Sequence, residues 1–149
     1  MDPHVNAQQA VARIVRLFEH LQPADVAALG EHYTHAAWFK DPFNEVRGLP
    51  AVQRIFGHMF DTLEAPRFRV TSALVQGEEA FLAWEFRFAF RAWRRGGEQL
   101  VRGASHLKLA PDGRIAWHRD YWDAAEEVYE KLPLLGGLMR WLKTRARPG

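Results

Sequence analysis

The sequence predicts an α+β fold in which N-terminal helices cover a curved, cone-shaped antiparallel sheet. Apolar residues recur at helical spacing as far as Leu63, and from Phe68 the apolar period changes to two, which is the period of a β-strand. Helices followed by a run of strands are typical of α+β proteins. The chain has 149 residues, 48% of them hydrophobic, and this is enough for one ordinary core. We therefore expect a single domain over residues 1–149.

The first part of the chain predicts helices and one short strand. Apolar residues from Val11 to Leu21 form one stripe of an amphipathic helix, and Pro23 can open a second helix. Pro50 suits the first turn of a third helix, whose apolar residues have the most regular helical spacing in the chain. The expected helices cover residues 11–21, 23–33 and 50–63. An apolar strand is expected at 36–39, followed by a turn at 41–44.

The second part predicts four strands and further helices. The strands are expected at 68–75, 81–93, 100–109 and 114–122, with turn sequences at Gly96-Gly97 and Asp112-Gly113. Asp123 and Glu126 have the spacing of a capping box and predict a helix. A leucine-rich, basic helix is expected beyond Pro133. Such a helix can lie on a membrane surface, but docking over its own domain is favoured.

Composition limits the classes of function. The chain lacks cysteine, which excludes disulfides and thiolate chemistry and suits a cytoplasmic protein. A net charge of +2 and the lack of a recognisable motif argue against nucleic-acid binding. The chain shows no signal peptide and no apolar run long enough to span a membrane. His32 and His35 have a spacing compatible with shared metal ligation, but no third ligand is evident, so we expect no metal.

Polar residues lie among tryptophans on the last expected strand. His118, Asp120 and Trp122 are two residues apart, so they share one face of the strand. An imidazole and a carboxylate on such a face predict the wall of a pocket. The alternatives are an ion pair of Asp120 with an arginine and a histidine that is merely hydrogen-bonded. Ser105 would line the same pocket if the hairpin placed it opposite His118, as a hydrogen-bonding residue and not as a nucleophile.

Two segments carry a resemblance to a known superfamily. Phe39-Lys40-Asp41-Pro42 with Gly48 is similar to the segment of ketosteroid isomerase that bears the general base. Residues 113–123, followed by Leu132-Pro-Leu-Leu-Gly136, are similar to the C-terminal part of limonene epoxide hydrolase. The chain thus resembles the nuclear transport factor two-like superfamily, which also includes SnoaL-like polyketide cyclases. The resemblance implies a cystatin-like, SnoaL-like α+β barrel around a hydrophobic pocket.

The resemblance also implies catalytic residues. Asp41 falls on the general base, although an Asp-Pro pair is also a common turn. Asp120 falls on a catalytic aspartate, and Arg87 matches the arginine between the two acids of the epoxide hydrolase. Ala89 stands where the second of those acids should be, and the tyrosine and protonated acid of the isomerase are missing. Neither reaction is therefore implied in its strict form. The expected catalytic residues are Asp41, Asp120, Arg87 and His118, and the expected substrate-binding residues are Tyr33, Trp38, Phe56, Glu85, Ser105 and Trp122.

The strand at 81–93 admits two orientations. Burial of aromatic residues places Trp84, Phe86 and Phe88 in the core and the charged residues in water. The resemblance implies the reverse, with Glu85 and Arg87 in the pocket and the aromatic face on the outer surface. We follow the resemblance, which predicts a homodimer through that aromatic face.

The sequence therefore predicts a pocket protein whose enzymatic nature stays open. The favoured function is a cofactor-free general acid/base enzyme, of the isomerase, cyclase or hydrolase type, acting on a small apolar carbonyl, hydroxyl or epoxide compound. The main alternative is a binding module that holds a small hydrophobic ligand without chemistry. A third hypothesis makes the aromatic sheet face a docking surface for another protein.

Overall fold

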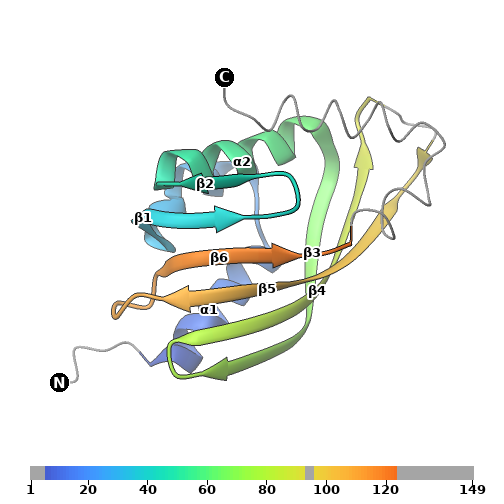
Figure 1. Ribbon diagram of the computed structural model, residues 1–149. Helices are drawn as coiled ribbons and strands as arrows, with labels where there is room; N and C mark the ends of the chain where they lie inside the picture. The colour runs from blue at the N-terminus through green and yellow to red at the C-terminus, as the bar shows by residue number, and fades with distance from the viewer. Residues whose placement is uncertain (1–5, 93–95, 124–149) are drawn as a thin grey trace.

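The computed structural model describes residues 6–92 and 96–123, and in this part of the chain three helices pack against one six-stranded sheet (Figure 1). The helices are α1 (Ala7–Glu19), the 3-10 helix η1 (Pro23–Glu31) and α2 (Leu49–Thr62). The strands are β1 (Tyr33–Lys40), β2 (Glu45–Arg47), β3 (Leu63–Gln76), β4 (Glu79–Phe90), β5 (Gln99–Leu109) and β6 (Ile115–Tyr121). The helices expected after residue 122 lie outside the described residues.

The helices form where the apolar spacing predicts them. In α1 the buried residues Ala10, Val11, Ile14 and Phe18 form one stripe, and the side chain of Asn6 caps the first turn. Gly48 precedes α2 with φ of 102°, a left-handed conformation that glycine adopts without a steric penalty. Tyr33 was expected in the second helix, and this expectation is wrong because the chain is already extended there and Tyr33 begins β1.

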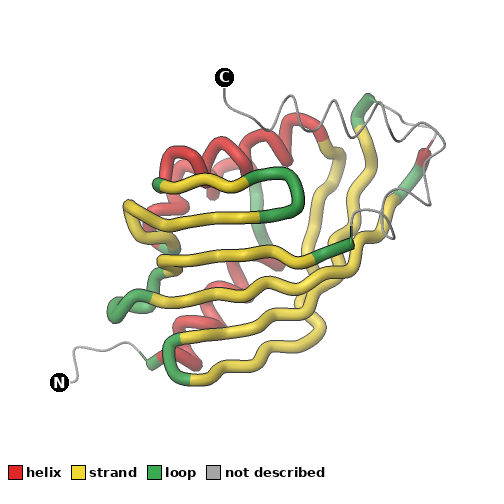
Figure 2. The backbone as a smooth tube through the Cα atoms, in the orientation of Figure 1, coloured by secondary structure: helices red, strands yellow, loops and turns green. Residues whose placement is uncertain are grey.

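The sheet has the strand order β2-β1-β6-β5-β4-β3. It is not closed, since β2 and β3 form its two edges, and the long strands β3, β4 and β5 bend strongly. The strand pairs are antiparallel except β1 and β6, which run parallel, so the sheet is mixed and not purely antiparallel. The short edge strand β2 was not predicted, because three residues are too few to show a period. Figure 2 shows the helices behind the sheet, with α1 packed against β3 and α2 against β1 and β3.

The aromatic face of β4 points into the protein. Trp84, Phe88 and Phe90 are buried, whereas Glu85 and Arg87 pair with each other on the opposite face, with 3.2 Å between Arg87 Nη2 and Glu85 Oε2. The expectation that Glu85 and Arg87 face the pocket is therefore wrong. The physical reason is that each large ring removes far more apolar surface from water than its charged neighbours do. The surface on which the predicted homodimer was based, formed by Trp84, Phe86 and Phe88, consequently faces inward.

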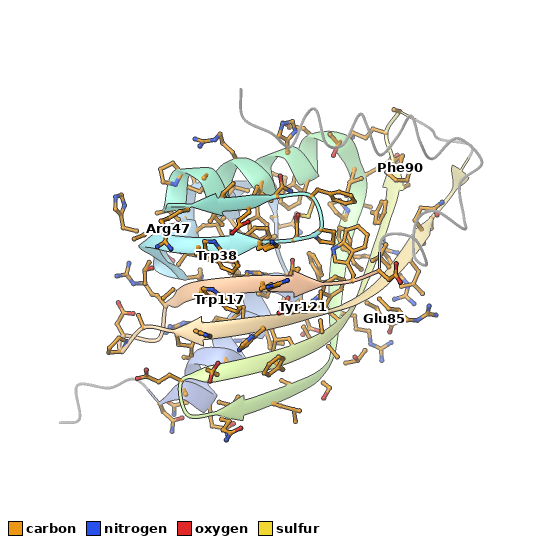
Figure 3. The ribbon with its side chains drawn as sticks, in the orientation of Figure 1. Trp38, Arg47, Glu85, Phe90, Trp117 and Tyr121 are labelled. Atoms are coloured by element: carbon orange, nitrogen blue, oxygen red, sulfur yellow. The ribbon has the colours of Figure 1, made fainter. Side chains whose placement is uncertain are left out.

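The outer face of the sheet carries a second set of rings. Trp38 on β1 stacks on Trp117 of β6, with ring centroids 4.9 Å apart, and the two lie side by side in Figure 3. His106 packs against Trp117 and also stacks on Phe81, which is 49% exposed. Trp38 was expected to line the pocket, and that expectation is wrong, because it points to the outer face of β1.

Candidate functional site

A cavity of about 220 Å³ lies between the inner face of the sheet and the helices α1 and α2. Its walls are mainly aromatic and aliphatic, with side chains such as Phe18, Phe56 and Phe86. A pocket of this kind, apolar with a few convergent polar groups, is a usual ligand site. The polar residues of the wall are Asp41, Asn44, His58, Thr62, Ser105, His118 and Asp120.

A chain of hydrogen bonds connects β1, β6, β5 and β4 at the polar part of this cavity. The Tyr33 hydroxyl lies 2.7 Å from Nδ1 of His118, and Nε2 of His118 lies 2.6 Å from Oδ1 of Asp120. Ser105 donates its hydroxyl proton to the same Oδ1 of Asp120 over 2.5 Å. Trp84 donates its indole N–H to Ser105 Oγ over 2.9 Å. These bonds hold the Asp120 carboxyl through Oδ1, and no hydrogen bond from another residue of 6–92 or 96–123 reaches Oδ2.

The direction of the bonds around His118 follows from the chemistry of its neighbours. Burial raises the pKa of the Tyr33 hydroxyl well above its ordinary value, and the charge of Asp120 adds to the rise, so Tyr33 keeps its proton and can donate it. An ionised Asp120 accepts, which places a proton on Nε2 of His118 and leaves Nδ1 to accept from Tyr33. Both ring nitrogens of His118 are therefore engaged within the protein, and these bonds hold the imidazole between Tyr33 and Asp120.

Ser105 is placed by strand register. It lies opposite Asp120 in the pairing of β5 with β6, whereas His118 lies opposite Leu107. The serine is buried, 4% exposed, and lines the cavity. The sequence predicted Ser105 as a hydrogen-bonding pocket residue, and the structure places it in the cavity wall, two residue pairs away from the register that was considered.

Asp41 lies at the end of β1, in the turn between β1 and β2. Its Oδ1 accepts hydrogen bonds from the backbone N–H groups of Phe43 and Asn44, at 2.8 and 2.7 Å, so it also holds the turn. Burial raises the pKa of the Asp41 carboxyl above its ordinary value, and the charge of Asp120 adds to the rise, while the hydrogen bonds from Phe43 and Asn44 oppose it. The Asp41 side chain therefore both stabilises the turn and lines the cavity.

The site residues expected from the sequence divide into those of the cavity wall and those outside it, and the second group includes Trp38 and Glu85. The cavity wall includes Asp41, Phe56, Ser105, His118, Asp120 and Trp122. Tyr33 is fully buried behind His118 and acts on the wall through it. Arg87 contacts Glu85 and Glu98 and is not part of the wall, so the expected arrangement of Arg87 with Asp120 is not formed.

The prediction from the sequence did not place two important residues, Trp84 and Asn44, in the site. Trp84 was assigned to the outer surface, although the general preference of tryptophan for burial would have placed it correctly. Asn44 donates from Nδ2 to both carboxylate oxygens of Asp41 at 3.1 Å. The signal for Asn44 was the Asp-Pro-Phe-Asn sequence itself, because a turn of this kind brings the first and fourth side chains together.

Tyr33→Phe tests the hydrogen-bond chain without altering the shape of the core. The variant leaves Nδ1 of a 3% exposed histidine without its partner, so we expect the free energy of unfolding to fall by about 1–3 kcal/mol. Urea denaturation measures this change. Tyr121→Phe is the matched control, since Tyr121 is 47% exposed and should change stability little. Equal small effects of the two variants would show that the bond to His118 contributes nothing.

Within residues 6–92 and 96–123, no cluster of histidine and acidic side chains is arranged to hold a metal ion. None of the helices in this same part of the chain is long and apolar enough to cross a membrane.

The curved, unclosed mixed sheet with its helices agrees with the superfamily that the sequence resembles. Residues 14–118, more than half of the chain, match the family model described as a SnoaL-like domain. The chain belongs to the SnoaL-like domain family. A search of curated proteins finds no match for this SnoaL-like chain.

Solved structures confirm the fold of this SnoaL-like domain. An NTF2-like protein from Burkholderia thailandensis has a TM-score of 0.70 at 16% identity, covering 85% of this chain and 97% of that one. An LEH-like epoxide hydrolase from M. tuberculosis has a TM-score of 0.66 at 15% identity, covering 91% and 94%. A proposed SnoaL-like polyketide cyclase from Shewanella denitrificans has a TM-score of 0.68 at 14% identity, covering 84% and 95%. At these identities the similarity concerns the fold.

Proposed function

We propose that this SnoaL-like domain is a cofactor-free general acid/base enzyme that adds water to a small and largely apolar molecule and thereby opens one of its C–O bonds, as in an epoxide. The observation that carries the proposal is the presence of two carboxyl groups in different environments on one cavity wall. Asp120 is held by two donors, whereas burial raises the pKa of Asp41. Such a difference lets one carboxyl accept a proton while the other gives one.

The roles follow from the hydrogen bonds. Oδ2 of Asp120 would take a proton from water as the water oxygen forms its bond to carbon. Asp41, which holds a proton more readily, would give that proton to the oxygen whose bond to carbon breaks. Asp41 is then the acid in the water-addition reaction, whereas the resemblance to ketosteroid isomerase implies a base at this position.

The surroundings of Asp120 support water chemistry over an isomerisation through an enolate. An enolate oxygen needs donors that stabilise its charge. The side-chain donors beside Asp120, namely Ser105 and the Nε2–H of His118, already point to its own Oδ1, and Trp84 is bonded to Ser105. A reaction that leaves the charge on the carboxylates and builds up no separate oxyanion fits these contacts better.

A binding module remains the second candidate function, because one observation favours it. Asp41 accepts from two backbone N–H groups and from the Asn44 amide, which is also what a purely structural turn residue would do. The cytoplasmic location and the homodimer also stay predictions. If a homodimer forms, the aromatic residues Trp38, Phe81 and Trp117 on the outer face offer it a surface, in place of the inward face of β4.

The test is incubation of the protein in ¹⁸O-labelled water with a panel of small cyclic epoxides. Mass spectrometry would detect label in a product that forms faster with the protein than without it. Conversion of a panel compound that depends on Asp120 and Asp41 supports the proposal. Conversion that survives the loss of both carboxyls contradicts it.

A further inference from the structure

The polar part of the cavity is rich in acceptors and poor in free donors. The Ser105 hydroxyl and the Nε2–H of His118 donate to Asp120, and the Trp84 indole N–H donates to Ser105. The Asn44 amide donates hydrogen bonds to both carboxylate oxygens of Asp41. Among the residues that the structure describes, none forms a hydrogen bond with Oδ2 of Asp120, so a ligand would meet an acceptor oxygen there.

The charged residues of the cavity wall also favour a ligand that donates hydrogen bonds. The lining residues include two aspartates and, within the described part of the chain, no lysine or arginine. Arg87, the basic residue expected to balance Asp120, pairs with Glu85 and Glu98 instead. The side chains of Asp120 and His118 are only 17% and 3% exposed, so water screens the carboxylate weakly. A ligand that covered this carboxylate without donating to it would leave a buried charge unpaired, which is costly.

We propose that the cavity selects ligands with an apolar ring-sized body and a hydrogen-bond donor as head group, a hydroxyl or a protonated amine, and discriminates against the corresponding carbonyl and carboxylate compounds. This rests on the proposed function and on the same two carboxyls, and it extends that function to the hydroxyl-bearing products of water addition. An epoxide has no donor of its own and would meet Asp120 through the attacking water. The donor head binds Asp120 Oδ2, and the body packs against the phenylalanines of α1, α2 and β4, such as Phe18, Phe56 and Phe86.

Three side chains could instead donate to a carbonyl ligand: Asp41 while it holds its proton, His58 and Trp122. His58 on α2 and Trp122 after β6 line the cavity and carry N–H groups that could serve a carbonyl. Neither touches Asp41 or Asp120 through a hydrogen bond within the described residues. A carbonyl ligand that used them would leave the Asp120 carboxylate unpaired, and this is the outcome that the experiment must be able to detect.

The experiment compares four ligands of one shape: cyclohexylamine, cyclohexanol, cyclohexanone and cyclohexanecarboxylate. Dissociation constants come from changes in the protein's ¹H–¹⁵N NMR spectrum at constant pH and salt. A hydrogen bond to a charged group corresponds to about ten- to hundredfold in affinity, so cyclohexanol should bind more tightly than cyclohexanone by about that factor. Cyclohexylamine distinguishes the protonated amine from the hydroxyl as head group. If it binds more tightly than cyclohexanol, the positive charge contributes to affinity. If the two bind equally, hydrogen-bond donation alone is sufficient. Cyclohexanecarboxylate should bind weakest.

Asp120→Asn provides the decisive variant, because its amide offers a donor where the carboxylate offers only acceptors. The ratio of cyclohexanol to cyclohexanone affinity should fall by about tenfold or more in this variant. Asp61→Asn, an equal change on the exposed side of α2, should leave the ratio unchanged. The inference is overturned if cyclohexanone binds as well as cyclohexanol to the unaltered protein. That result would leave the acid/base assignment standing, since turnover in the labelled-water assay tests it separately.

Discussion

Gly103→Ala should be among the most destabilising single changes in the described part of the chain, with a fall of about 2–4 kcal/mol in the free energy of unfolding. Gly103 on β5 pairs with Trp84 on β4. A Cβ at this position would lie 2.7 Å from Cζ2 and 2.9 Å from Cζ3 of the indole, and closer still to Cη2. The ring is large and buried, so it must shift, and its bond to Ser105 must lengthen or break.

The matched control for this change is Gly57→Ala. Gly57 lies within α2, and a Cβ there would meet nothing within 4 Å. Because alanine has a higher helix propensity than glycine, Gly57→Ala should raise the free energy of unfolding by about 0.5–1 kcal/mol. Urea denaturation of the two variants gives the comparison. Equal effects, or a stable Gly103→Ala protein with an unmoved Trp84 indole N–H resonance, would show that Trp84 does not occupy this position.

Asp120→Asn should reduce turnover of any compound that the labelled-water assay identifies by about 10²–10⁴-fold, the usual effect of losing a general acid or base. Asparagine keeps the shape and can still accept the hydrogen bond from Ser105, so the loss reports on proton transfer and not on the fold. Asp41→Asn should cause a loss of similar size, since the amide can still accept from the backbone of Phe43 and Asn44 but has no acidic proton to give.

The double variant, Asp41→Asn with Asp120→Asn, shows whether the two carboxyls act in one step or independently. If both take part in the same proton transfers, the double variant should lose little more activity than either single one. Asp61→Asn should keep full activity, because this exposed residue lies away from the cavity wall. Single variants with unchanged turnover would contradict the acid/base mechanism and would favour the binding module.

Much of the fold could be predicted because it depends on local patterns. The stripe from Val11 to Phe18 and the alternation within β4 are readable from the sequence alone. The edge strand β2 and the parallel pairing of β1 with β6 could not be read, because a three-residue strand has no period and strand order is a long-range property. The shared face of His118 and Asp120 followed from the period of two, and both residues line the cavity.

The site was predicted less well where resemblance was preferred to burial. Glu85 and Arg87 were placed in the pocket by analogy, yet the aromatic side chains of the same strand compete for the inner face and gain more from it. The hydrogen bonds of Trp84 to Ser105 and of Tyr33 to His118 join residues 21 and 85 positions apart, so no local pattern could reveal them. Alternation gives the face of a strand, but it does not give the partner across the core.

The most direct test of the central claim is a ¹³C NMR titration of the Asp41 carboxyl carbon. The cavity that buries Asp41 and the nearby charge of Asp120 should raise its pKa above the ordinary value of 3.8, and removing that charge by Asp120→Asn should lower the pKa again. In this result Asp41 holds a proton more readily than a free aspartate, as an acid working beside a second carboxylate requires. A pKa at or below 3.8 that Asp120→Asn does not change would contradict the mechanism and leave Asp41 as a turn residue.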